Sequence, residues 1–413
     1  MMRMGDVGRK VRFGVIGLGK RGMWHLSELV QMKDVEIAAV CDPWPDRVDQ
    51  AVRIVEDACG FRPDAATDDR EVTGQNDIEG VFIFSNWESH IRIALDAIRS
   101  GIRPALEVGG ANSVEECWEL VRASEISGVP VMLLENCCYC REEMTLLNMI
   151  RQGVFGELVH VQGGYQHDLR DEIGNGDVTR HYRQRHFLHR NAELYPTHEL
   201  GPIARYLSIN RGNRMVSLVS VASKAAGLHA WFTEHRADSA LAGAPVHEGD
   251  IVNTIITCAN GETILLTHDC TLPRPYSRGG RIQGTRGIWM EDTRTIYLDG
   301  ISPADPSYWD HRWESDEKYM AEYKHPLWKE YEEYGLRGGH GGADYLVIRA
   351  YIESVQNQTQ PPIDVYDTAA WMSVTALSEH SIAMGGLNVP VPDFTGGRWI
   401  TDRKKAEGMY SLD

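Results

Sequence analysis

The sequence predicts an α/β protein, with a doubly wound parallel sheet in the N-terminal part and an α+β domain with a large, mostly antiparallel open sheet after it. Up to about residue 136, short apolar runs alternate with helical patterns over short connections, which is typical of parallel β-α-β units. After about residue 150, alternating runs follow one another with turn signals between them, which is typical of antiparallel strands. A chain of 413 residues is long enough for two domains. We expect them at residues 1–136 and 137–413.

The expected elements of the first domain follow from the period of the apolar residues. Strands that are buried on both faces are near-continuous apolar runs, and the helices between them carry apolar residues every three or four positions. By these criteria, strands are expected within residues 11–16, 36–42, 80–85, 103–110 and 129–137, and helices within 23–30, 47–60, 91–101 and 113–128.

The second domain is expected to contain more strands than helices. Strands are predicted within residues 156–169, 214–223, 249–259, 263–271, 278–285 and 287–292, and a helix within 193–209. The segment 308–342 is rich in Trp, Tyr and Gly and is predicted to form loops over a site. Its aromatic residues are expected either to form a wall of that site or to belong to a core or an interface. Two apolar-periodic helices are expected near residues 343–385, where we expect them to pack back on the first domain, and an extended tail follows them.

A glycine motif lies directly between the first strand and the first helix. Gly17, Gly19 and Gly22 form G-x-G-x-x-G, in which the first glycine permits a tight turn and the second lets a pyrophosphate approach the backbone. The third lets the helix pack close to the strand. The second strand ends at Asp42, 25 residues after Gly17, where a carboxylate accepts hydrogen bonds from a ribose and repels a 2′-phosphate. The sequence therefore predicts a Rossmann domain that binds NAD.

Further cofactor contacts are expected at the carboxyl ends of the parallel strands, because ligands of such sheets bind there. Polar residues follow three of the predicted strands, and two basic residues follow Gly19. The complete set of expected cofactor residues is Gly17, Gly19, Lys20, Arg21, Gly22, Asp42, Ser85, Asn86, Trp87, His90, Glu107 and Asn136.

Composition and charge exclude several classes of partner. The net charge of −17 argues against binding to nucleic acid or to an anionic membrane surface. No apolar run reaches the roughly 18 residues of a membrane span, and no apolar export signal precedes the first strand. This chain is therefore expected to be cytoplasmic, and export of a longer precursor stays open. The scattered cysteines are interpreted as small buried apolar residues in a reduced compartment. Neither Cys137–Cys140 nor the histidines at 181–189 have the spacing of metal ligands, so we expect no metal.

The residues best suited to proton chemistry lie between 165 and 202. Tyr195 and His198 are three apart at a predicted helix start, so they share a face and could divide acid–base work on a hydroxyl group. A structural pair in a satisfied polar network is the alternative. Tyr165 and His167 lie at the end of a predicted strand and could equally be catalytic or structural. Arg183 could bind substrate oxygens or pair with an acid.

Sequence blocks along the chain resemble one known family. The N-terminal half is similar to the glucose–fructose oxidoreductase, inositol dehydrogenase and MocA superfamily, and the chain as a whole resembles glycoside hydrolase family 109, the NAD-dependent α-N-acetylgalactosaminidases. The superfamily usually has Glu-Lys-Pro at the fourth strand, whereas this chain has Glu107-Val108-Gly109, and the glycosidase branch also lacks the lysine. Glu199, which stands where a glycine is common, departs from the branch, as does Gly109-Gly110 in place of Pro-Ala. The matching blocks are VEECWELV, LENCCY, GGYQHDLRD, LYPTHELGPIA, SINRG, ANGETILLTHD, PRPYSR, HPLWK, GHGGADYL and VPDFTGGRW.

The resemblance implies a redox elimination rather than hydrolysis by paired carboxylates. In this scheme hydride leaves sugar C3 for bound NAD⁺, the C2 proton and the C1 substituent are lost, water adds at C1, and the hydride returns. The functional positions that the resemblance carries over are Glu135, Tyr165, Arg183, Tyr195, His198 and Tyr276. We expect Tyr195, His198 and Tyr165 to be catalytic, and Glu135, Arg183, Tyr276 and His167 to bind substrate.

Two other functions stay open at this point. One is an NAD-dependent sugar or cyclitol dehydrogenase with true cofactor turnover, and the other is a protein that binds the dinucleotide and catalyses nothing. The expected partner is a small carbohydrate or glycoside, with neither nucleic acid nor membrane. By resemblance alone, the open antiparallel sheet implies a homo-oligomer, either a dimer or a tetramer. The exact sugar, its anomer and the aglycone are not predicted.

Overall fold

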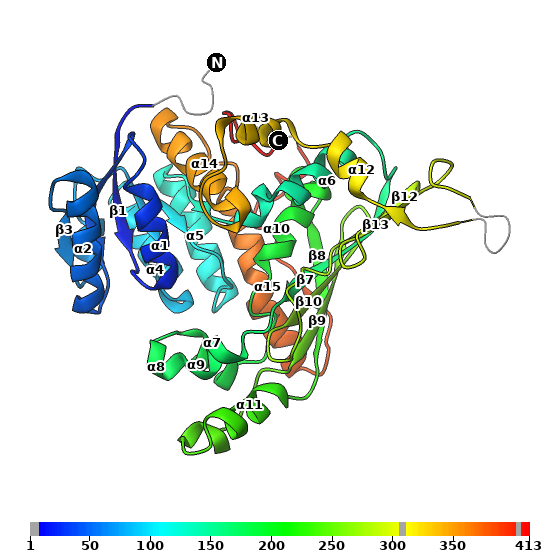
Figure 1. Cartoon of the computed structure of the whole chain (residues 1–413), viewed down its shortest axis with the longest axis horizontal. Helices are drawn as coiled ribbons and strands as arrows, with labels where there is room; N and C mark the ends of the chain where they lie inside the picture. The colour runs from blue at the N-terminus through cyan, green and yellow to red at the C-terminus, as the bar shows by residue number, and fades with distance from the viewer. Residues whose placement is uncertain (1–7, 305–310, 402–405) are drawn as a thin grey trace. The chain divides into compact units, whose positions relative to one another are not determined.

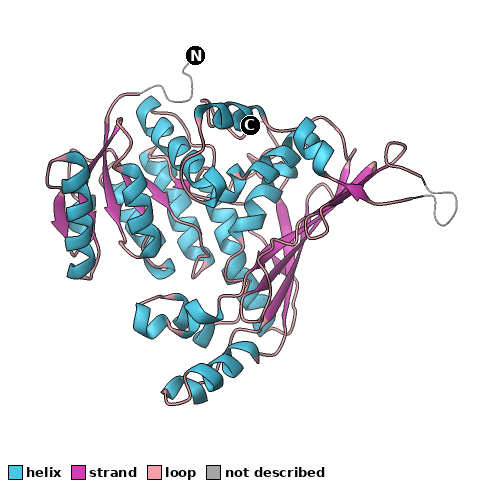
Figure 2. Ribbon diagram, viewed as in Figure 1, coloured by secondary structure: helices cyan, strands magenta, loops and turns pink. Residues whose placement is uncertain are grey.

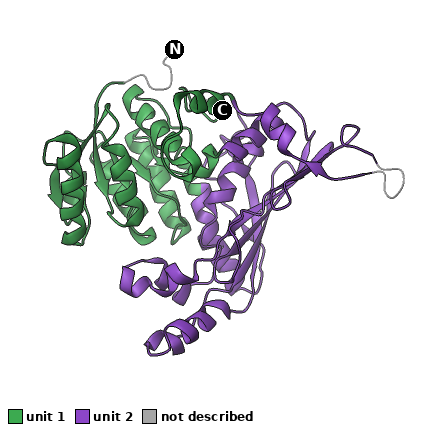
Figure 3. Ribbon diagram, in the orientation of Figure 1, with its two compact units in different colours: residues 1–140, 326–369, 404–413 green, residues 141–325, 370–403 purple. Residues whose placement is uncertain are grey.

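The computed structural model describes residues 8–304, 311–401 and 406–413, and the chain divides into two compact units (Figure 3). Unit 1 comprises residues 1–140, 326–369 and 404–413, and unit 2 comprises residues 141–325 and 370–403. The C-terminal third of the chain therefore contributes to both units. Each unit contains its own sheet.

Unit 1 contains a six-stranded parallel sheet with the order β3-β2-β1-β4-β5-β6. This order is that of a Rossmann fold, in which the strands reverse their direction of spread between the first and fourth strand. The predicted doubly wound sheet is confirmed. The strands are β1 (Val11–Ile16), β2 (Val35–Cys41), β3 (Asp64–Ala66), β4 (Gly80–Ile83), β5 (Arg103–Leu106) and β6 (Met132–Leu133).

Side chains cap the starts of the unit 1 helices at 87–99 and 114–127. Ser113 caps the helix at 114–127 by accepting a hydrogen bond from the Glu116 backbone N–H, and the Glu116 carboxylate accepts one from the Asn112 N–H. This arrangement closely resembles a capping box. In Figure 1 the helices up to residue 127 lie in the blue to cyan part of the chain, and the two helices within 326–357 are gold to orange. The helices are α1 (Lys20–Leu29), α2 (Pro45–Cys59), α3 (Arg70–Thr73), α4 (Trp87–Arg99), α5 (Val114–Ser127), η1 (Asn136–Tyr139), α13 (Pro326–Tyr334), η3 (His340–Gly342) and α14 (Ala343–Asn357).

Helix α14 reaches the parallel sheet from far along the chain. The Tyr351 hydroxyl accepts a hydrogen bond from the Val81 N–H at 3.1 Å and donates one to the Arg103 carbonyl at 2.5 Å. Gly80 makes room for it, because a Cβ there would lie 2.5 Å from that hydroxyl oxygen. A single buried phenol therefore joins the helix to β4 and β5.

Unit 2 is built on a nine-stranded sheet with the order β14-β13-β12-β11-β7-β10-β9-β8-β15, drawn in Figure 2 as a band of magenta strands. Among the strands of this sheet that the structure describes, only β7 and β10 pair in parallel, so the mostly antiparallel sheet that the sequence predicts is confirmed. The strands are β7 (Leu158–Gln166), β8 (Met215–Ala222), β9 (Ile251–Cys258), β10 (Thr263–Asp269), β11 (Arg281–Gly284), β12 (Gly287–Met290), β13 (Thr295–Leu298), β14 (Glu314–Ser315) and β15 (Val389–Pro390).

The helices of unit 2 are mostly short. Residues 170–189, a charged stretch in the sequence, form three helices of four to seven residues. The long helix α15 (Val365–Ala383) contains the division between the units. The other helices are α6 (Arg141–Arg151), α7 (Arg170–Gly174), α8 (Gly176–Thr179), α9 (Arg183–His189), α10 (Thr197–Tyr206), α11 (Gly227–His235), η2 (Ala240–Gly243) and α12 (Glu317–Glu322).

The prediction of loops over residues 308–342 is wrong for most of that segment. Helices α12 and α13 lie within it, and Trp328 and Tyr331 of α13 are buried. The Trp328 indole donates to the Tyr139 carbonyl at 2.9 Å, so these aromatic residues belong to the core of unit 1. The part of the prediction that falls on residues 308–310 lies outside the described residues.

The structure also shows the burial of the cysteines and the character of the helices. Most cysteines are buried, but Cys59 is exposed, contrary to its interpretation as a buried apolar residue. Within the described ranges, no helix combines the length and the apolar character that crossing a membrane requires.

Candidate active site

In unit 1, the glycine motif lets α1 pack close to the end of β1 in the parallel sheet. Gly17 has φ of 92°, and a Cβ at Gly22 would lie 1.9 Å from the Gly17 carbonyl oxygen. Both positions therefore require glycine for α1 to start at the end of β1. Gly19 differs, because a Cβ there would meet only the Arg47 guanidinium, at 3.8 Å. The fold does not need glycine at position 19, which leaves the backbone there open to a ligand.

The N-terminus of α1 suits an anion that the chain does not supply. No side chain caps it, and its first turn carries no acidic residue, whereas α2, α4 and α5 each have an acid in the first turn. Lys20 and Arg21 occupy the first turn instead. The first N–H groups of the helix, the helix dipole and two cations together fit a pyrophosphate.

Asp42, directly after β2, binds the backbone of the glycine motif. The carboxylate is 3 % exposed, and its two oxygens accept hydrogen bonds from the Leu18 N–H at 2.7 Å and the Trp44 N–H at 3.0 Å. The Arg47 guanidinium lies 3.6 Å away. Each carboxylate oxygen can accept more than one hydrogen bond, so a ribose hydroxyl remains an acceptable donor here.

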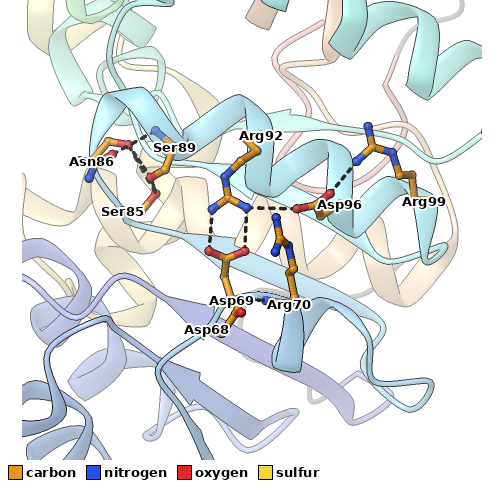
Figure 4. A network of polar contacts seen from close by, with 9 residues as sticks. All are labelled: Asp68, Asp69, Arg70, Ser85, Asn86, Ser89, Arg92, Asp96 and Arg99. Carbon is orange, nitrogen blue, oxygen red and sulfur yellow. Dashed lines mark hydrogen bonds and ion pairs between the residues drawn. The ribbon is translucent and has the colours of Figure 1, made fainter.

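The residues after β4 support the start of α4, as Figure 4 shows. The Asn86 side chain accepts a hydrogen bond from the Ser89 N–H at 3.0 Å, and the Ser89 hydroxyl donates to the Ser85 hydroxyl at 2.8 Å. His90 is fully buried against the Ser85 carbonyl, and burial lowers the pKa of its imidazole to about 4. The Trp87 indole is buried and donates to the Val108 carbonyl at 3.2 Å. The buried Trp87 and His90 side chains thus contact the backbone carbonyls of Val108 and Ser85 and help to fix the chain after β4 and β5.

The same figure shows how the neighbouring surface is held. Arg92 of α4 donates two hydrogen bonds to Asp69, at 2.6 and 3.0 Å, and a third to Asp96 at 3.1 Å. Asp96 also accepts from Arg99 at 2.6 Å. This exposed network ties α4 to the start of α3.

Three further predicted residues lie at the ends of β5 and β6. The Glu107 carboxylate lies 3.5 Å from the Arg21 guanidinium and 3.7 Å from the His25 imidazole. The Asn136 amide donates to Asp344 at 2.7 Å. Glu135 is fully buried and accepts a hydrogen bond from the Cys137 N–H at 3.0 Å.

In unit 2, the predicted aromatic and imidazole residues form one cluster around Tyr165 at the end of β7. The Tyr165 ring lies 4.4 Å from the Tyr195 ring and 5.4 Å from the His198 ring, measured between centroids. Its hydroxyl is 3.3 Å from His167 Nδ1, and the Tyr276 ring is 6.5 Å away. Tyr165, Tyr195 and His198 are each less than a tenth exposed, whereas Tyr276 is 49 % exposed. The structure therefore brings these five residues together.

Local pairing explains how distant segments meet in this cluster. Backbone hydrogen bonds of 3.0 and 3.2 Å join Ser277 to Gln166, which places Tyr276 beside Tyr165. Tyr195 precedes α10 rather than lying on it, with Pro196 at the N-cap, while His198 is in the first turn. The two rings are nevertheless 4.8 Å apart.

Arg183 supplies the positive charge of the cluster. Its guanidinium carbon lies 4.9 Å from the centroid of Tyr195 and 5.7 Å from that of Tyr165. Burial and the charge of Arg183 lower the pKa of the His167 imidazole, so His167 is neutral near pH 7. Burial raises the pKa of the Tyr165 phenol, and the Arg183 cation opposes that rise. The cluster thus contains a protonated phenol at Tyr165 beside a cation that can stabilise an oxyanion.

Sequence reasoning missed Glu172, the partner of that cation. Its carboxylate accepts a hydrogen bond from Arg183 at 3.1 Å and lies 3.6 Å from His181. Nothing in the spacing of the charged stretch distinguishes it, since Arg183 is eleven residues further on and the whole of α8 lies between them.

A second missed residue, Arg278, anchors the segment that carries Tyr276. Its guanidinium forms ion pairs with Glu143, with Glu199 at 3.3 Å and with Glu291 at 3.8 Å. Glu199 follows His198, and its side chain occupies the space over Gly163, where a Cβ would lie 1.7 Å from Glu199 Cγ. The unusual glutamate therefore fits because β7 has a glycine beneath it.

Behind the cluster lies a buried group of three ionisable residues. His268 is 3.2 Å from Glu248, and Glu193 accepts a hydrogen bond from the Tyr195 N–H at 3.3 Å. Each is at most 2 % exposed. Burial raises the pKa of Glu193 to about 7 and also raises that of Glu248. Burial alone would lower the pKa of His268, but Cys270, Glu248 and Glu193 hold it well above its usual value.

The fold and these residues define a two-unit, NAD-binding enzyme with a cluster of aromatic and imidazole side chains in its second unit. Residues 11–134 match the family model of the oxidoreductase family with an NAD-binding Rossmann fold, and residues 139–401 match that of the glycosyl hydrolase 109 C-terminal domain. The chain belongs to glycosyl hydrolase family 109. It is an NAD-dependent glycosidase.

Individual relatives agree with this assignment. The chain is 42 % identical to a glycosyl hydrolase family 109 protein of Stenotrophomonas maltophilia, over 98 % of this chain and 93 % of the relative. It is 39 % identical to an α-N-acetylgalactosaminidase of Tannerella forsythia, over 94 % and 87 %. A levoglucosan dehydrogenase in complex with NADH and levoglucosan has the same fold, with a TM-score of 0.68 at 19 % identity, over 93 % of this chain and 100 % of the other.

The glycine motif gives a matched pair of variants. Gly22→Ala places a methyl group against the Gly17 carbonyl, so it should lower both the melting temperature without cofactor and the affinity for NAD⁺. Gly19→Ala should leave that melting temperature unchanged and weaken binding by about tenfold or more, because the methyl occupies space that the fold leaves open. Calorimetric titration and thermal melting measure both quantities. Equal affinity of Gly19→Ala and wild type would contradict this assignment.

The buried Glu193 predicts a pH dependence of stability. Between the unfolded-state pKa of about 4.3 and the folded-state value of about 7, the folded chain holds more protons at this position, so stability falls as pH rises. Glu193→Gln should therefore lose less melting temperature than wild type between pH 5 and pH 8. Glu234→Gln, at an exposed glutamate of α11, is the control. Parallel pH profiles of wild type and Glu193→Gln would show that Glu193 does not titrate in this range.

Proposed function

We propose that the chain hydrolyses N-acetylgalactosaminides or closely related glycosides through a redox elimination that uses bound NAD⁺. The observation that carries the proposal is the cluster in unit 2, where a buried phenol at Tyr165 contacts two imidazoles and a second phenol beside the Arg183 cation. These groups move protons and stabilise oxyanions, which is what a ketone-forming cycle requires of a protein.

The residues are assigned to the two carbons where protons move. Tyr195 and His198, with rings 4.8 Å apart, take and return the proton of the C3 hydroxyl. Tyr165 exchanges a proton at C2 or C1, and the His167 Nδ1 atom, 3.3 Å from its hydroxyl, relays that proton. Because His167 is neutral near pH 7, it is able to accept it.

The remaining residues hold the sugar. Arg183 stabilises negative charge on the sugar oxygen at C3 when the C2 proton leaves, and Glu172 holds the guanidinium in place. Tyr276, half exposed at the edge of the cluster, binds sugar oxygens. NAD⁺, held by the glycine motif, α1 and Asp42, supplies reversible hydride acceptance at C3. Its return to the oxidised form explains how a hydrolase can use a dinucleotide without consuming it.

Two findings favour a glycosidase cycle over net sugar oxidation. The Tannerella forsythia relative carries the name of an α-N-acetylgalactosaminidase, which supports the substrate class proposed here. Where related dehydrogenases usually have a lysine, Val108 is buried, and its carbonyl accepts the Trp87 indole N–H. No ammonium group is therefore available from that position for the oxidation of a hydroxyl.

The proposal predicts aglycone release without net reduction of the cofactor. With p-nitrophenyl N-acetylhexosaminides, nitrophenol absorbance should rise while the absorbance at 340 nm stays flat. Tyr165→Phe and His198→Ala should lose about 10²-fold or more in kcat because proton transfer is lost, with NAD⁺ binding retained. Tyr206→Phe, in the same helix as His198 but outside the cluster, should keep near wild-type activity. NADH formation from free sugars without nitrophenol release would instead establish a dehydrogenase.

A further inference from the structure

One buried carboxylate in unit 1 joins three segments that are far apart in the sequence. Asp344, at the start of α14, is 1 % exposed. It accepts hydrogen bonds from Arg21 at 3.0 and 3.3 Å, from the Asn136 amide at 2.7 Å and from His340 at 2.7 Å. Although burial disfavours the charged form, the His340 and Arg21 donors hold the pKa of Asp344 well below its usual value. The group is therefore an anion at the centre of a polar network.

Two of these partners belong to the expected cofactor site. Arg21 lies in the first turn of α1, directly after the glycine motif, where a pyrophosphate fits. Asn136 follows β6, at the carboxyl end of the sheet. Asp344 thus contacts both the phosphate-binding helix and the strand end that we expect to meet the cofactor.

The third partner belongs to a glycine-rich strap, residues 338–342, that leads into α14. Four of its five residues are glycine, and positive φ angles occur at Gly338, His340, Gly341 and Gly342. A Cβ at Gly339 would lie 2.7 Å from the Trp24 ring of α1 and 3.0 Å from Asp344. The strap therefore packs directly on α1, and its glycines at 338, 341 and 342 adopt positive φ angles without strain.

A second acid restrains Arg21 from the other side. Glu107 lies 3.5 Å from its guanidinium, and the Trp24 ring lies 5.6 Å from it. His25, stacked on Phe84 at 4.7 Å, completes this side of the network. Burial and the charge of Arg21 lower the pKa of His25 to about 3, so His25 adds no charge. Arg21 is consequently held between two carboxylates and an aromatic ring.

We propose that Asp344 is a positioning residue for the dinucleotide site, which ties the strap to Arg21 and Asn136 and thereby retains NAD(H) in unit 1. Retention through the catalytic cycle rests on the proposed function, since only an enzyme that regenerates its cofactor gains from holding it. The link that Asp344 makes between the strap, Arg21 and Asn136 is supported by its hydrogen bonds and does not depend on the proposed function. A dehydrogenase, by contrast, must release its reduced cofactor after each turnover.

The test measures cofactor release without any sugar. Full-length protein loaded with NADH is mixed with excess NAD⁺, and the loss of bound NADH fluorescence gives the release rate. Asp344→Asn keeps the shape of the side chain but removes its charge, and it should speed release by about tenfold or more, as expected for the loss of a charged hydrogen bond. His340→Ala, a milder change at the half-exposed end of the network, should speed release by a smaller factor.

A matched control separates retention from the stability of α14. Glu353, on the same helix, accepts hydrogen bonds from the Met409 and Tyr410 N–H groups, and it lies outside the network of Asp344. Glu353→Gln should lower the melting temperature yet release NADH at the wild-type rate. If folded His340→Ala and Asp344→Asn release NADH as slowly as wild type, or if Glu353→Gln accelerates release equally, the proposal is wrong. Because no glycoside is present, this result is independent of whether the proposed hydrolysis occurs.

Discussion

The close approach of Gly22 to the Gly17 carbonyl is the constraint on which the cofactor site depends. It allows α1 to begin at the end of β1 with its first N–H groups uncapped. The chain then places no acid in that first turn, although it does so in α2, α4 and α5. The dipole of α1 and its first N–H groups are thus suited to a phosphate, whereas side chains cap the starts of α4 and α5.

In unit 2, too, a glycine leaves space that another part of the chain occupies. Gly163 in β7 leaves room for Glu199, which is adjacent to His198 in sequence and pairs with Arg278. The carboxylate thereby ties the start of α10 to the segment that carries Tyr276. Tyr165, on the same strand, lies where both segments meet. The buried Arg183 cation lies beside the Tyr165 and Tyr195 rings, where a positive charge favours the charged form of a phenol.

Local patterns were sufficient to predict the parallel sheet, the antiparallel sheet and the glycine motif, because each is encoded in a short window of sequence. Strands β3 and β6, of three and two residues, were missed or overextended because so few residues carry no periodic signal. The aromatic segment that contains α13 was misread as loops, since its burial depends on Tyr139, almost 200 residues away.

The residues of the candidate site also differ in whether the sequence alone could predict them. Tyr165, His167, Tyr195, His198, Tyr276 and Arg183 could be named from sequence, and the structure brings them together, while their roles stay predictions. Glu172, Arg278 and Asp344 could not be found in this way. Asp344 meets Arg21 across 323 residues, and only the three-dimensional arrangement makes that contact visible.

The central claim is that hydrolysis passes through loss of the proton at sugar C2. The most direct measurement is hydrolysis of a nitrophenyl N-acetylgalactosaminide in deuterated water, followed by mass and NMR analysis of the released sugar. The account predicts one carbon-bound deuterium at C2 in the product, because the proton lost there is replaced from solvent. Release of sugar with protium fully retained at C2 would contradict the account and would require direct displacement at C1.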